Sequence, residues 1–112
     1  MIRESAYIVV ERNTIWEGEA ASEPYEVGWA KEAILYFQVL DGKAAATTTQ
    51  LRVQLSPDGV RWCDEGTVID LPTVPGQVAF ARVSHFGGWL RLAASIADGV
   101  RLPVLISAHL KA

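Results

Sequence analysis

Few residues of this chain could carry out chemistry, and they are widely separated. The two histidines, His85 and His109, are the candidates for a general base. A catalytic triad would need one of them beside a nucleophile and an orienting carboxylate, and no local signature marks such a set around either residue. We therefore expect no catalytic residues and no enzymatic activity, with both histidines in exposed or edge positions.

The lone cysteine, Cys63, is followed by Asp64 and Glu65. Negative charge beside a thiol disfavours the thiolate form that attacks substrates, and two acids without further ligands make a poor calcium site. One cysteine cannot form an internal disulfide, which excludes a secreted scaffold stapled by cystines. The sequence therefore predicts no metal site and no cofactor.

Nucleic acids and phosphate groups are also poor candidates as ligands. The net charge is −3, and the ten basic residues are scattered along the chain. Binding to nucleic acid by phosphate neutralisation would need a basic stripe. The pair Gly87-Gly88 precedes a predicted strand, so it cannot form a phosphate cradle at a helix N-terminus.

Aromatic residues give the strongest functional hint, because the 112 residues include four tryptophans. Trp62 and Trp89 fall at strand positions that we expect to pack in the core. Trp16 and Trp29 lie in short segments flanked by polar residues, with Tyr25 near the second. Tryptophan and tyrosine are enriched in protein interfaces, and they also form platforms for sugars. Trp16, Tyr25 and Trp29 are therefore the candidate interface or glycan-binding residues.

The segments that position these residues have the two-residue period of β-strands. Polar and apolar residues alternate without error from Gln50 to Leu55, and from Leu102 to Leu110 every second residue is apolar. Further strands are predicted at 6–11, 14–19, 25–29, 33–40, 78–83 and 89–96. The segment 33–40 is apolar on both faces, which is typical of a central strand covered on both sides. We interpret 42–49 as a mobile loop.

The stretch SPDGVRW, residues 56–62, is a turn signal that ends in Trp62. Asp58-Gly59 is a strong hairpin signal, because glycine accepts the positive φ that a tight reversal needs. We therefore assign Asp58 and Gly59 to a structural turn, with Trp62 and Trp89 closing the core beside it.

About eight strands separated by turn clusters predict an all-β fold: one antiparallel β-sandwich or jelly roll that forms a single domain over residues 1–112. No run approaches the roughly 20 apolar residues that span a bilayer, and the apolar stretch near the N-terminus is too short for a signal peptide. We expect a soluble protein that is made in the cytoplasm and does not bind membranes.

Two resemblances to known families follow from these motifs. LRVQLSPDGVRW (51–62) together with GWLRL (88–92) resembles part of the discoidin-type jelly rolls. That family is longer and usually secreted with paired cysteines, which this chain lacks. The same motifs, with the length of the chain and its apolar final strand, are similar to small all-β structural proteins of tailed phages and prophages.

The phage resemblance covers nearly the whole chain. It implies a non-enzymatic head or tail accessory or decoration subunit, made in the bacterial cytoplasm and located in a virion or phage-like particle. Its partners would be other copies of itself and further particle proteins. The alternative is a carbohydrate-binding module in which exposed aromatic residues bind a glycan.

Overall fold

The computed structural model describes residues 5–40, 50–72 and 74–112. These residues form nine strands and no helix. The strands are β1 (Ser5–Trp16), β2 (Glu19–Ala21), β3 (Tyr25–Glu26), β4 (Glu32–Val39), β5 (Gln50–Ser56), β6 (Cys63–Asp70), β7 (Val78–Ser84), β8 (Trp89–Ser95) and β9 (Leu102–Lys111). The strand predicted at 6–11 and the first half of the strand predicted at 14–19 form β1, which ends at Trp16. The loop predicted at 42–49 lies outside the described residues.

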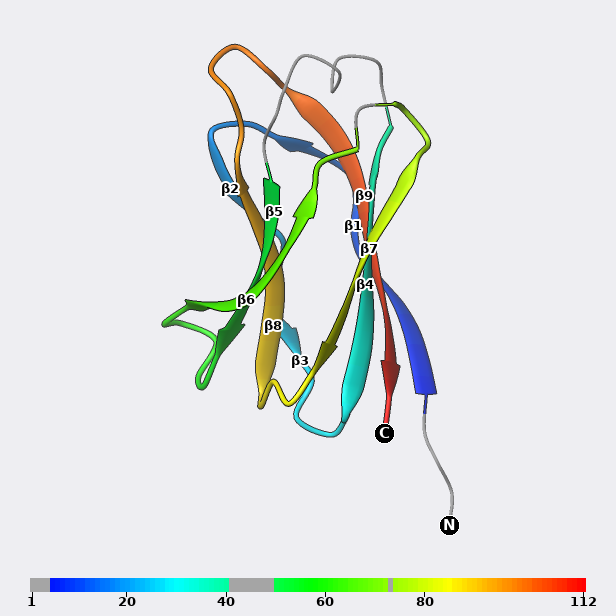
Figure 1. The fold of residues 1–112 in the computed structure, drawn as a ribbon, viewed down its shortest axis with the longest axis vertical. Helices are drawn as coiled ribbons and strands as arrows, with labels where there is room; N and C mark the ends of the chain where they lie inside the picture. Colours follow the sequence, from blue (N-terminus) through cyan, green and yellow to red (C-terminus); the bar gives the residue numbers. More distant parts are fainter. Residues whose placement is uncertain (1–4, 41–49, 73) are drawn as a thin grey trace.

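The strands form two antiparallel sheets that pack as a sandwich (Figure 1). One sheet has the order β1-β9-β4-β7, and we call it the first sheet. The second sheet has the order β2-β8-β5-β6, with β3 also paired to β8. Because β2 and β3 occupy the same edge, the nine strands fill eight positions. Apart from the β5–β6 hairpin and the shared edge of β2 and β3, successive strands cross from one sheet to the other as in a jelly roll, which confirms the predicted fold class.

The core follows from the alternation of side chains along the strands. The apolar set of β9 is buried between the sheets as predicted: Leu102, Val104, Ile106, Ala108 and Leu110. β4 contributes Ala33, Leu35, Phe37 and Val39. At one end of this core the rings of Trp16 and Phe37 lie with their centroids 5.3 Å apart.

Strand β4 lies inside the first sheet, between β9 and β7, as predicted for residues 33–40. The expectation that both its faces are covered is wrong. Its outward residues Ile34, Tyr36 and Gln38 are only half-buried, because no further layer of described residues packs on the outer side of the first sheet. An apolar strand face is therefore left in contact with solvent.

Strand β1 forms one edge of the first sheet and pairs with β9 through two irregularities. The register shifts between Val9 and Glu11 and again between Arg12 and Thr14, as at β-bulges. Asn13, inside the second shift, has a positive φ of 55°. The first shift brings Glu11 to the inward side, opposite Ile106, and the second restores the alternation of Ala6 and Ile8, so that Trp16 again points inward opposite Leu102.

The turn at residues 57–62 joins β5 to β6 and is longer than a two-residue hairpin. The buried Ser56 hydroxyl accepts hydrogen bonds from the backbone N–H groups of Asp58 and Gly59, at 3.2 and 2.8 Å. One carboxylate oxygen of Asp58 then accepts from Val60 N and Arg61 N, both at 2.9 Å. The bond from Arg61 N, followed by that from Val60 N, lowers the pKa of Asp58. The Ser-Pro-Asp-Gly sequence thus fixes this corner through its own side chains.

Candidate interaction face

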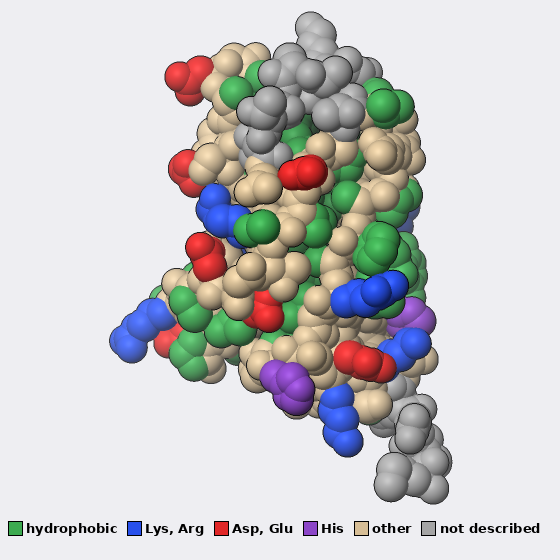
Figure 2. All heavy atoms as spheres, viewed as in Figure 1, with side chains coloured by type: hydrophobic (Ala, Val, Ile, Leu, Met, Phe, Trp, Pro, Cys, Tyr) green, Lys and Arg blue, Asp and Glu red, His purple; other side chains and the backbone are tan. Residues whose placement is uncertain are grey.

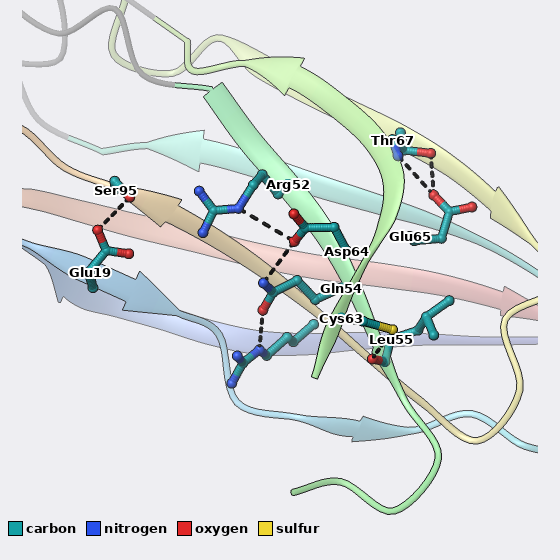
Figure 3. Close-up of polar contacts among 10 residues, drawn as sticks. Glu19, Arg52, Gln54, Leu55, Cys63, Asp64, Glu65, Thr67 and Ser95 are labelled. Carbon is teal, nitrogen blue, oxygen red and sulfur yellow. Dashed lines mark hydrogen bonds and ion pairs between the residues drawn. The ribbon is translucent and has the colours of Figure 1, made fainter. Parts of the chain in front are cut away.

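The outer surface of the second sheet is covered by polar groups that bind one another (Figure 3). Asp64 forms an ion pair with Arg52 at 3.7 Å and accepts a hydrogen bond from Gln54 at 3.0 Å. Gln54 in turn accepts from Arg91 Nε at 2.8 Å. The guanidinium of Arg91 lies 4.3 Å from the centre of the Trp62 ring. Burial, and next the charge of Arg52, lower the pKa of Arg91.

The outer surface of the first sheet is different in kind. Its outward side chains from β1, β4, β7 and β9 form a surface that we call the aromatic face: Tyr7, Val9, Ile34, Tyr36, Val78, Phe80, Leu105 and His109. Tyr7 is 62% exposed, Phe80 50% and Val78 47%. Hydrophobic side chains run along the flank of the molecule where this sheet lies, on the right in Figure 2.

Charged side chains border the aromatic face. The guanidinium of Arg82 lies 5.3 Å from the centre of the Phe80 ring. Glu32 and Lys111 stand opposite each other on β4 and β9, and Arg12 is exposed on β1. An apolar centre with a polar rim is the typical anatomy of a protein interface, whereas surface hydrophobic residues that have no such role are usually scattered singly.

Two shallow depressions lie on this face, and His109 lines both of them. One is also lined by Tyr7, Tyr36 and Leu105. The other extends from Ile34 past Arg82 towards the rim. These depressions give the face relief into which side chains of a partner could fit.

The aromatic residues singled out from the sequence do not form one platform. Trp16 is 2% exposed and packs on Phe37, so the expectation that it contributes to an exposed surface is wrong. Its side chain points inward because Trp16 stands opposite Leu102, whose side chain is in the core. Tyr25 is half-buried against the core, opposite Leu90 of β8. Trp29 is 40% exposed in the connection between β3 and β4.

The residues assigned to the turn and core lie around the corner between β5 and β6. Gly59 has a φ of 80° and lies against the Trp89 ring. Trp89 is half-buried there. Trp62 is also half-buried, but it covers Arg91 on the outer surface of the second sheet instead of closing the core. Arg91 points outward because its neighbours in β8, Leu90 and Leu92, fill the core.

The potential chemical groups remain separate in the described part of the chain. His85 is exposed in the turn after β7, whereas His109 lies half-buried on β9. Cys63 is exposed, and its sulfur lies 3.7 Å from the carbonyl oxygen of Leu55. Residues 5–40, 50–72 and 74–112 contain no group of three or more His, Cys, Asp or Glu side chains placed to hold a metal ion. Within the same ranges, no helix of the length and hydrophobicity needed to cross a membrane occurs.

Sequence reasoning missed the aromatic face. Tyr7, Tyr36 and Phe80 come from β1, β4 and β7, which are far apart in the chain. One signal was present, since residues 33–40 are apolar on both faces. That pattern predicts a strand covered on both sides, although a strand with a partner-binding face has the same pattern.

No family model matches this chain, and no curated protein matches its sequence. Among solved structures, it is similar to the SPBc2 prophage-derived protein YomS, with a TM-score of 0.62 and 8% identity over 100% of this chain and 96% of that one. The two chains therefore share a fold over nearly their full lengths.

Two further solved structures are more distantly similar. A chain from the disulfide-linked pili of Bacillus endospore appendages has a TM-score of 0.45 and 15% identity, over 97% of this chain and 86% of that one. A chain of infectious bursal disease virus, Gx strain, has a TM-score of 0.49 and 11% identity, over 97% of this chain and 32% of that one.

Proposed function

We propose that this protein is a non-enzymatic structural or assembly subunit of a phage-like particle, and that it acts through the aromatic face. The exposure of large apolar side chains on one sheet surface carries this proposal. Removal of such area from water contributes about 25 cal/mol per Å². Tyr7, Phe80 and Val78 are each close to half exposed or more, so they have much area left to bury.

The contrast between the two sheets supports the choice of this face. Arg52, Gln54, Asp64 and Arg91 on the second sheet already bind one another or a ring. A partner on that surface would have to replace these contacts. A partner on the aromatic face would instead bury apolar area that is now in water.

The fold supports a role in a particle. The chain shares its jelly roll with a prophage-derived protein over nearly the whole of both chains, and the double-sheet jelly roll is a common architecture of viral capsid domains. The finer role that we propose is a head or tail accessory or decoration subunit, made in the bacterial cytoplasm. Its partners would be further copies of itself and other proteins of the particle.

The carbohydrate-binding alternative is not favoured. A sugar platform needs several aromatic rings exposed side by side, and one of the three candidate rings, that of Trp16, is in the core. Tyr25 is itself half-buried against the core, which leaves Trp29 as the single well-exposed ring of the set.

The test has two parts. Light scattering on the purified chain should show concentration-dependent association, which Phe80→Glu should weaken because it places a charge in the aromatic face. Val68→Glu is the matched control, because Val68 is 51% exposed and lies opposite Arg52 on the second sheet.

Purified particles from cells that carry the gene should contain the chain. Intact particles that lack it would contradict the proposed function.

A further inference from the structure

The outward side chains of the first sheet, which comprise the aromatic face and the residues that border it, stand in rows across the sheet. The strand registers place four outward residues in each row, one each from β1, β9, β4 and β7. In that order the rows are Ser5, Lys111, Glu32 and Ser84; Tyr7, His109, Ile34 and Arg82; Val9, Ser107, Tyr36 and Phe80; and Arg12, Leu105, Gln38 and Val78. The seam between β9 and β4 divides each row in half.

We infer that the aromatic face binds a second copy of this chain, related by a two-fold axis that runs parallel to the strands along the seam between β9 and β4. A two-fold contact uses the same patch on both subunits. This particular axis places β9 against the partner subunit's β4 and β1 against its β7. Each row then faces the same row of the partner.

The charges that border the aromatic face are complementary in this arrangement. Lys111 faces the partner subunit's Glu32, and by symmetry Glu32 faces the partner subunit's Lys111. Within the described chain these two residues are exposed and neither forms an ion pair. Both stand in the outermost row, so this pairing requires the strands of the two sheets to lie nearly parallel, closer than the usual crossing angle of about 30°.

The aromatic residues are complementary as well. Tyr7, the most exposed aromatic side chain of the face, meets the partner subunit's Arg82. That guanidinium already lies over the Phe80 ring of its own chain, so it would be held between two rings. Arginine over an aromatic ring is a favourable contact, and it gains strength when water is excluded. Phe80 itself meets the partner subunit's Val9.

A two-fold axis that lies between the two sheets but runs along the rows, perpendicular to the strands, gives a poorer match of charges. It would place Lys111 against the partner subunit's Leu105, and Glu32 against the partner subunit's Gln38. Neither charge would then gain an opposite charge across the interface, as both do about the axis along the seam. The charge pattern therefore selects the axis along the seam.

A mixing experiment tests the arrangement, which rests on the proposed function because it assigns a partner to the same face. Lys111→Glu gives a chain with two acids at these positions, and Glu32→Lys gives one with two bases. For each variant alone, the dissociation constant of the dimer should be at least about tenfold higher than for the parent, because like charges face each other twice. An equimolar mixture should recover dimerisation, since both contacts are then attractive. Contacts within one chain cannot respond to mixing.

Sedimentation velocity, with one variant carrying a fluorescent label, measures this recovery. Arg61→Glu is the control, because it makes the same charge change as Lys111→Glu but at the exposed corner of the second sheet. It should leave dimerisation unchanged. Circular dichroism should show that every variant is folded. A mixture that stays as weak as its components, or a parent chain that is monomeric at all concentrations, would overturn the inference. The presence of the chain in purified particles would still be a separate test of the proposed function.

Discussion

The ring of Trp89 lies against the backbone of Gly59, so closely that a Cβ on Gly59 would come within 3.2 Å of two ring atoms. Trp89 begins β8, and Gly59 is in the turn between β5 and β6. The corner is therefore held from two sides, by the hydrogen bonds to Ser56 and Asp58 and by an indole ring that only a glycine accommodates at this distance.

Gly59→Ala should lower the free energy of unfolding by about 1–3 kcal/mol, because an L-residue at positive φ is strained and the ring must also shift. Urea denaturation gives this value. Gly18→Ala is the control, since Gly18 also has a positive φ, of 58°, but has open space where its Cβ would lie. Gly18→Ala should cost less. Equal losses from the two substitutions would show that the Trp89 contact has no effect.

Asp58 should make stability depend on pH in the acid range. Its pKa is lowered below 3.8 in the folded chain by the N–H groups of Arg61 and Val60. A carboxylate with a lowered pKa stabilises the fold above its unfolded pKa, and this contribution is lost as the pH falls through the folded pKa. Asp58→Asn should thus be less stable than the parent at pH 6, and the difference should shrink below pH 3.8. Urea midpoints measured from pH 6 to pH 2.5 test this. A difference that stays constant with pH would contradict it.

Truncation of Trp16 should destabilise the fold much more than truncation of Trp29. Trp16→Ala removes a buried ring that packs on Phe37 and should cost about 3–5 kcal/mol. Trp29→Ala removes a ring that is 40% exposed and should cost about 1 kcal/mol or less. Thermal and urea unfolding give both values. A Trp16→Ala protein as stable as the parent would show that this tryptophan is outside the core.

Arg91 and Trp62 should be energetically coupled. A double-mutant cycle with Arg91→Ala and Trp62→Ala should give about 0.5–1 kcal/mol for a partly exposed cation–π contact. The hydrogen bond from Arg91 to Gln54 cancels in the cycle, because it is absent from both chains that lack Arg91. The same cycle with Arg101, which pairs with Glu17 and not with a ring, should be additive. Coupling in both cycles would instead indicate a general effect of charge.

The fold could be predicted from the sequence because its strands are short and their alternation is regular. In β5 and β9 every second side chain enters the core, as expected from the pattern alone. The inward side chains of β1 could not all be predicted in this way. Its two register shifts interrupt the alternation at Glu11 and Arg12 and then restore it, so that Ile15 faces out and Trp16 faces in. A local pattern does not contain a bulge that forms only against β9.

The aromatic face could not be predicted, because it depends on strand order. Tyr36 and Phe80 become neighbours only when β4 pairs with β7, and Val9 joins them only through β9. These pairings bring together segments that are up to about a hundred residues apart in the chain, and the registers fix which side chains share a row. These residue types are equally compatible with surface and core positions, and the choice between the two follows only from the strand registers.

The irregular register of β1 has a consequence for how copies of this chain can meet in a crowded cell. A long, regular edge strand offers unpaired backbone groups to any similar strand, and such edges seed amyloid-like fibres. The two bulges bend and interrupt this template along β1. Open-ended growth from strand to strand is thereby discouraged at this edge.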